Sequence, residues 1–255
     1  MDLKNKSFSA IVTNRWDIVR AMAIKTRALP YADLDLPLTG ALYWDDERSS
    51  APGLLLVHGG AGLDQHAREQ AGRYAGLGYT VLAADMYGIA GDRDRIIATA
   101  TALRADPALL VRRGTAGLTA LAGCAEADGV LGAVGFCFGG LAVLTLARAG
   151  VDLAAVISMH GTLATPAPAG PGAVTARVLV CHGAADPHVP MSQVVGFTEE
   201  MRAADADWRL IMYGRAVHGF THRQPSATPG VAYDAEADTG SFAAAAGFLR
   251  ACAST

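Results

Sequence analysis

A short apolar run, a glycine-rich turn and a second apolar run follow one another between residues 129 and 148. Residues 129–134 (GVLGAV) favour a buried β-strand and residues 141–148 favour a helix, and the turn between them reads GFCFGG. A strand that turns sharply into a helix needs small residues beside the turning point, and the glycines of residues 135–140 supply them. The pattern predicts a nucleophile elbow, which would present Cys137 at the tip of a strained turn.

Two interpretations of Cys137 remain open on this segment alone. In the first, the thiol lies beside a helix N-terminus, where the helix dipole favours the thiolate form that attacks carbonyl groups. In the second, Cys137 is a buried structural cysteine in a glycine-rich turn. The choice depends on whether a base and an acid follow at matching places in the chain.

The rest of the chain alternates short apolar runs with helical patterns, which is typical of an α/β protein with a mostly parallel sheet covered by helices on both faces. Residues 22–29 and 38–44 predict a hairpin, and the Pro- and Gly-rich residues 165–172 predict a loop. We expect one domain over residues 22–255 and an N-terminal appendage over residues 1–21. The predicted strands are residues 40–44, 54–58, 80–84, 130–134, 154–159, 178–181 and 209–213. The predicted helices are residues 64–77, 93–104, 107–125, 138–149, 191–204 and 235–251.

Composition excludes several classes of protein. The 255 residues carry a net charge of −3, which argues against nucleic acid or an anionic membrane surface as a partner. No stretch approaches the roughly 18 apolar residues of a membrane span, and the N-terminus lacks a signal-peptide core, so we expect a cytoplasmic protein. The four cysteines show no metal spacing and are expected to be reduced thiols. We expect no metal and no cofactor, and the sequence leaves the oligomeric state open.

A base and an acid do follow Cys137, each after a predicted strand. Asp186 comes shortly after the strand at residues 178–181, and His218 lies in a glycine-flanked loop after the strand at residues 209–213. Nucleophile, acid and histidine occur in this order in α/β-hydrolase sheets, where ligand chemistry takes place at the carboxyl ends of the strands. Together the three residues favour a catalytic triad, although Asp186 alone could cap a turn and His218 alone could bond to backbone.

The other histidines divide into two groups. His58 and His182 stand at strand ends and are expected to be buried and bonded to backbone, whereas His66 falls in a helical stretch and is expected at the surface. The candidate substrate-binding residues near the catalytic edge are Gly59, Tyr87, His160, His188 and His222.

The chain resembles the dienelactone hydrolase family of α/β-hydrolases over about residues 22–249. The matching segments are residues 57–63 (VHGGAGL), 78–79 with 84–88 (ADMYG), 135–140 (GFCFGG), 183–190 (GAADPHVP) and 218–220 (HGF). The resemblance implies that Cys137 is the nucleophile, His218 the base and Asp186 the residue that orients it. It also implies that the backbone N–H groups of Gly60 and Phe138 stabilise the oxyanion.

The sequence departs from the family pattern at the positions that hold the family's substrate. Gly59 stands where dienelactone-cleaving members carry an activating glutamate, so activation is expected to depend mainly on His218. Ile89 and His222 stand where the family has two arginines that bind the substrate carboxylate, and Arg93 and Arg223 are near but displaced. Because these departures remove the family's carboxylate-binding arginines, we expect a pocket that favours neutral acyl groups.

We therefore expect a hydrolase that cleaves small carboxylic esters or lactones through a thioester on Cys137. The alternative is a protein that binds a small ligand without turnover, with Cys137 as a redox-responsive or ligand-capturing thiol. An oriented base favours the enzyme, because a binding pocket does not need one.

Overall fold

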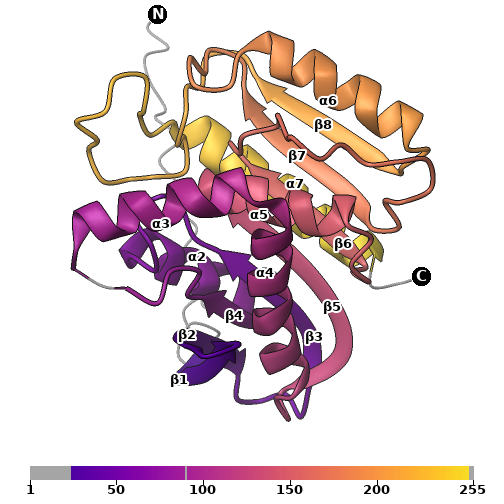
Figure 1. The fold of residues 1–255 in the computed structure, drawn as a ribbon. Helices are drawn as coiled ribbons and strands as arrows, with labels where there is room; N and C mark the ends of the chain where they lie inside the picture. Colours follow the sequence, from indigo (N-terminus) through magenta and orange to yellow (C-terminus); the bar gives the residue numbers. More distant parts are fainter. Residues whose placement is uncertain (1–23, 90, 253–255) are drawn as a thin grey trace, which may run out of the picture.

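The computed structural model describes residues 24–89 and 91–252, which form one eight-stranded sheet with helices on both sides (Figure 1). This arrangement confirms the predicted α/β-hydrolase fold. The expected appendage at residues 1–21 lies outside the described residues. The strands are β1 (Ile24–Asp33), β2 (Leu36–Asp45), β3 (Ala51–Val57), β4 (Thr80–Ala84), β5 (Ala127–Phe136), β6 (Ala155–Met159), β7 (Arg177–Gly183) and β8 (Trp208–Tyr213). The helices are α2 (Gln65–Ala75), α3 (Arg93–Ala105), α4 (Pro107–Ala122), α5 (Phe138–Arg148), α6 (Met191–Ala203) and α7 (Ala235–Cys252).

The strand order is β1-β2-β4-β3-β5-β6-β7-β8. β1 and β2 form the predicted hairpin and β2 pairs antiparallel with β4, whereas all later neighbours run parallel. The hairpin is longer than expected, because a tight turn at Leu34, with φ of 54°, lets pairing continue to Asp33 and Leu36. The parallel strands therefore bring their carboxyl ends to one edge of the sheet, where the loops that follow them meet.

Both faces of the central strands are buried, as β3 illustrates. Leu54 and Leu56 pack on one side with residues of α2 and α7, whereas Leu55 and Val57 pack on the other with residues of α3, α4, α5 and α6. Successive side chains of a strand point to opposite faces, so a strand between two helix layers must be apolar at every position. All four of these side chains are fully buried.

The helix boundaries follow local capping chemistry. The side chains of Asp92 and Asp106 accept hydrogen bonds from backbone N–H groups at the starts of α3 and α4. The predicted end of α4 was wrong by three residues, because the helix stops at Ala122 and Gly123 forms its C-cap. The chain must turn there, since Glu126 already bonds to Ala51 at the start of β3. Within the described ranges, no helix combines the length and the apolar character needed to cross a bilayer.

Candidate active site

The predicted strand-turn-helix is present at Cys137, between β5 and α5. Cys137 has a φ of 53°, a conformation that L-residues rarely adopt, and its N–H donates to the carbonyl of Met159 at 3.0 Å. The small residues around it are required by packing. A methyl group added to Gly135 would collide with the carbonyl of Gly139, and one added to Gly140 would lie 2.6 Å from Gly161 Cα.

The structure brings Cys137, Asp186 and His218 together at the carboxyl ends of β5, β7 and β8. The Nδ1 atom of His218 donates to Asp186 Oδ2 at 2.8 Å, and its Nε2 atom lies 3.0 Å from Cys137 Sγ. The second oxygen of Asp186 accepts from the N–H groups of His188 and Val189 at 2.7 and 3.1 Å. These backbone bonds fix the carboxylate, which in turn fixes the imidazole with one nitrogen toward the thiol.

The electrostatics of the three residues favour a thiolate beside an imidazolium. Burial opposes a charge on His218, but hydrogen bonds with Asp186 and Cys137 outweigh it and raise the pKa of His218 to about 9. Burial likewise opposes the thiolate, but the hydrogen bond and charge of His218 lower the pKa of Cys137 below its usual value. Cys137 also precedes the first turn of α5, whose dipole favours a negative charge there.

A cavity of about 470 Å³ opens over Cys137. His188 and His222 line it as expected, whereas His160 and Tyr87 are completely or almost completely buried and are not among its lining residues. Gly59 lies just beneath the site, because a methyl group on it would be 3.8 Å from both Cys137 Cβ and the His222 ring. The lining residues are Gly60, Ala61, Arg104, Cys137, Thr162, His188, His218, Gly219, His222, Gln224, Pro225, Ser226, Thr228 and Val231.

The two residues expected to stabilise the oxyanion, Gly60 and Phe138, both lie close to the catalytic cavity or to Cys137. Phe138 begins α5, so its N–H has no partner within the helix, and it forms a hydrogen bond toward the Cys137 thiol. Gly60 follows β3, lines the cavity and has no atom within 4 Å of an added methyl group, so its backbone faces open space. This arrangement suits an oxyanion hole.

The expectation that His66 lies at the surface was wrong. His66 is buried, and its ring stacks on His222 with centroids 3.6 Å apart and planes 16° apart. Its Nε2 atom lies 3.0 Å from the hydroxyl of Thr221, which also bonds to His160 at 2.8 Å. Burial lowers the pKa of His66 to about 3, so this ring is neutral. Its stacking on His222 helps to hold the His222 ring in place.

The other two histidines set apart in the sequence are buried, as expected. His58 bonds to the Gly59 carbonyl at 2.7 Å and accepts from Met86 N–H at 3.2 Å. The Nδ1 atom of His182 has no hydrogen-bond partner, so the expected bond to backbone is not found at that nitrogen. In the part of the chain that the structure describes, no group of three His, Cys, Asp or Glu side chains could hold a metal ion.

The sequence did not reveal the arginine that borders the catalytic cavity. Arg223 bonds to Asp238 at 3.5 Å, and Arg93 is not among the lining residues. Arg104, in the last turn of α3, lines the cavity and places its guanidinium 5.6 Å from the centre of the Phe138 ring. Only the packing of α3 against the elbow brings it there, so no local sequence signal indicates it.

The sheet is mostly parallel and lies between helix layers, and at one edge of it a cysteine in a strained turn meets an aspartate-histidine pair. These features define an α/β-hydrolase. The particular family follows from comparison with known proteins. A model of the dienelactone hydrolase family matches residues 38–253, and the chain belongs to that family. It is therefore a hydrolase.

Solved structures and a relative agree with this membership. The structure named m3DLH is 35% identical and superposes with a TM-score of 0.84 over 90% of this chain and 99% of its own. The dienelactone hydrolase-like promiscuous phosphotriesterase P91 from metagenomic libraries is 36% identical, with a TM-score of 0.82 over 89% of this chain and 98% of its own. An uncharacterized protein of Caenorhabditis elegans is 45% identical over 125 residues, which are 47% of this chain and 78% of that protein.

Proposed function

We propose that the chain hydrolyses small carboxylic esters or lactones, with Cys137 as nucleophile, His218 as acid and base, and Asp186 as the group that orients His218. The observation that carries the proposal is the continuous contact from Asp186 through His218 to Cys137, at 2.8 and 3.0 Å, beneath an accessible cavity. A binding pocket without turnover would not need a buried carboxylate to align an imidazole on a thiol.

The reaction starts from the thiolate and the imidazolium. The Cys137 sulfur attacks the carbonyl carbon, a C–S bond forms, and the carbonyl electron pair moves to oxygen beside the N–H groups of Gly60 and Phe138. When the intermediate collapses, the C–O bond breaks and the alcohol leaves with the proton of His218. His218 then takes a proton from water, and the hydroxide attacks the thioester. The acid is released as the C–S bond breaks, which restores the thiolate and the imidazolium.

The test is to trap the thioester. Intact protein incubated with an activated aryl acetate should gain a transient mass of one acetyl group on the peptide that contains Cys137, and Cys137→Ala should lose both adduct and turnover. Adducts confined to Cys124, Cys181 or Cys252, with turnover retained in Cys137→Ala, would contradict the proposal.

A second candidate activity is phosphotriester hydrolysis at the same site. The similarity to P91, at 36% identity over nearly its whole length, supports it. Diethyl aryl phosphate tested beside aryl acetate should release the same phenol, and Cys137→Ala should abolish both reactions. No release from the phosphate above the uncatalysed rate would exclude this activity.

A further inference from the structure

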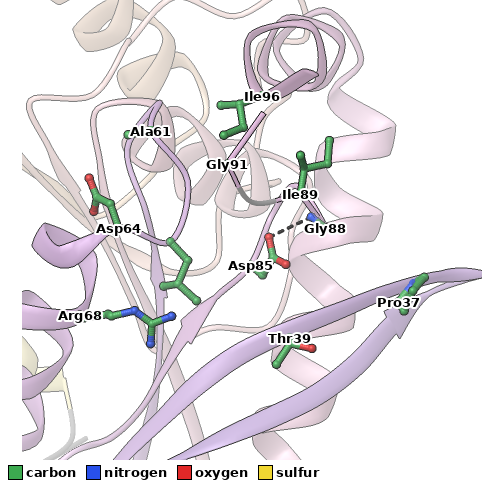
Figure 2. A pocket seen from close by; sticks show the side chains of 11 residues that line it. Pro37, Thr39, Ala61, Asp64, Arg68, Asp85, Gly88, Ile89, Gly91 and Ile96 are labelled. Atoms are coloured by element: carbon green, nitrogen blue, oxygen red, sulfur yellow. Dashed lines mark hydrogen bonds between the residues drawn. The ribbon is translucent and has the colours of Figure 1, made fainter. Parts of the chain in front are cut away.

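A second cavity of about 530 Å³ lies next to the catalytic one. It is bounded by β2, by the loops that follow β3 and β4, and by the first turn of α3 (Figure 2). Ala61 lines both cavities, so they meet at the loop that carries Gly60.

The cavity is lined by both apolar and polar side chains. Ile89 and Ile96 lie opposite Arg68 and Asp64 in Figure 2, and Leu63 is a further apolar lining residue. Thr39 and Asp85 are the remaining lining residues with polar side chains. Ile89 stands at the position of a carboxylate-binding arginine in the family pattern, so this chain has an apolar surface at that position.

Both carboxylates are held in fixed orientations. Asp64 accepts from the N–H of Ala67 at 3.0 Å, and one oxygen of Asp85 accepts from the N–H groups of Tyr87 and Gly88, each at 2.9 Å. No described residue bonds to the second oxygen of either carboxylate or forms an ion pair with Arg68. The cavity thus offers fixed acceptors, a guanidinium donor and a hydroxyl.

This set of groups favours a ligand that offers both hydrogen-bond donors and acceptors. Two carboxylates beside one guanidinium disfavour an anion, and a simple cation has no acceptor for Arg68. A neutral hydroxylated group satisfies all of them, because each hydroxyl donates to a carboxylate and accepts from arginine. Its C–H face can contact Leu63, Ile89 and Ile96.

The sheet topology indicates which part of the substrate reaches this cavity. Cys137 follows β5, His218 follows β8 on one side of it, and Asp85 follows β4 on the other side. In the proposed reaction His218 protonates the leaving alcohol, so the alcohol lies on the β8 side. The acyl group then extends toward β4 and the second cavity.

We propose that the second cavity is a subsite for a neutral polyhydroxylated acyl group, so that the preferred substrates are esters or lactones of polyhydroxylated carboxylic acids. This inference rests on the proposed function for the direction of the acyl group. The subsite itself rests on the residues that line the cavity.

The test compares methyl esters that differ only in hydroxyl groups. Methyl trihydroxycyclohexanecarboxylate and methyl cyclohexanecarboxylate are each prepared with no, one or two methylene groups between ring and carbonyl. For at least one of the three spacer lengths, kcat/KM for the hydroxylated ester should be at least tenfold higher than kcat/KM for the ester without hydroxyl groups. Arg68→Met and Asp64→Asn should each reduce this ratio about tenfold, the effect of one charge-assisted hydrogen bond. Asparagine keeps the cap at α2, and Arg202→Met on α6 is the matched control that should leave the ratio unchanged.

A binding measurement separates the two proposals. The unreactive carboxamide of the hydroxylated ring, titrated calorimetrically into Cys137→Ala, should bind with a Kd that rises about tenfold when Arg68→Met is added. Binding of this kind in a protein that hydrolyses no ester would refute the proposed function and support the subsite. Hydrolysis of the esters without a hydroxyl preference, or a preference for a carboxylate-bearing ring, would overturn the subsite.

Discussion

Replacing Asp186 with asparagine should reverse the direction of the hydrogen bond that orients His218. The Asp186 side chain is fully buried, and one oxygen already accepts from the N–H groups of His188 and Val189. The asparagine oxygen can keep those two bonds, which leaves its NH₂ group facing His218 Nδ1. Nδ1 must then accept, so the ring proton moves to Nε2, which faces the thiol and can no longer take a proton from it.

The expected loss in kcat is about 10³-fold, or about 4 kcal/mol of transition-state stabilisation. This is less than the roughly 10⁴-fold typical of serine triads, because a thiol ionises more readily than a hydroxyl. KM should change little, since Asp186 does not line the cavity.

The assay measures hydrolysis of phenyl acetate together with the pH dependence of Cys137 alkylation by iodoacetamide. Without the carboxylate the pKa of His218 falls, so less imidazolium remains and the alkylation midpoint should move to higher pH. Asp234→Asn is the control, because Asp234 also accepts from a backbone N–H, that of Ala237, but lies outside the catalytic cavity. A loss in kcat below tenfold with an unchanged alkylation profile would refute the reasoning.

Four further predictions concern the site and the packing around it. The raised pKa of His218, about 9, means that the imidazolium persists below that pH, so kcat/KM should fall as the pH rises through about 9; a rate that keeps rising to pH 10 would contradict this. At pH 7 iodoacetamide should modify Cys137 before Cys181, which is fully buried and whose pKa burial raises to about 12. His218→Ala should slow the alkylation of Cys137, and an unchanged rate would contradict the assignment of His218 as its partner. Gly135→Ala should destabilise the fold by about 3 kcal/mol in urea unfolding, because its methyl group would meet the Gly139 carbonyl. The control Gly72→Ala has open space around the added methyl group and should stabilise the fold by about 0.5–1 kcal/mol. Equal effects of the two substitutions would contradict the packing argument. Neutral aryl esters should have a higher kcat/KM than carboxylate-bearing dienelactones; a tenfold preference for the dienelactone that is lost in Arg104→Met would show that Arg104 binds the carboxylate.

The elements that were predicted best are those whose sequence pattern depends on the nearest neighbours in the chain. The strand at residues 80–84 was predicted with the bounds that β4 has, because a continuous apolar run follows a glycine turn at Gly78. The elbow was predicted for the same reason, since the requirement for glycine at a sharp turn is local. The order of Cys137, Asp186 and His218 then sufficed to expect that they meet, because parallel strands share one functional edge.

His66 shows what the sequence interpretation missed although a signal was present. The buried residues of α2 are His66, Ala67, Gln70, Ala71, Tyr74 and Ala75. They recur at the spacing of one helix face, which would have placed His66 on the buried side. Polar character alone suggested the surface, and the compensating partners lie far away in the chain at Thr221 and His222. Such partners can be identified only once the fold is known.

The strained backbone at Cys137 explains why glycines are needed beside it. A non-glycine residue in this backbone region costs about 1–3 kcal/mol, and relaxation to an ordinary conformation would turn Sγ away from His218. Two features oppose that relaxation: the Cys137 N–H is tied to Met159, and every residue of α5 is buried, so the helix cannot rotate to release the turn. The glycines permit the close approach of α5 to β3 and β6 on which this constraint depends. A substitution that relieved the strain would therefore loosen the same contacts that hold the thiol 3.0 Å from the imidazole. Stability gained at the elbow should for that reason be accompanied by a loss of turnover.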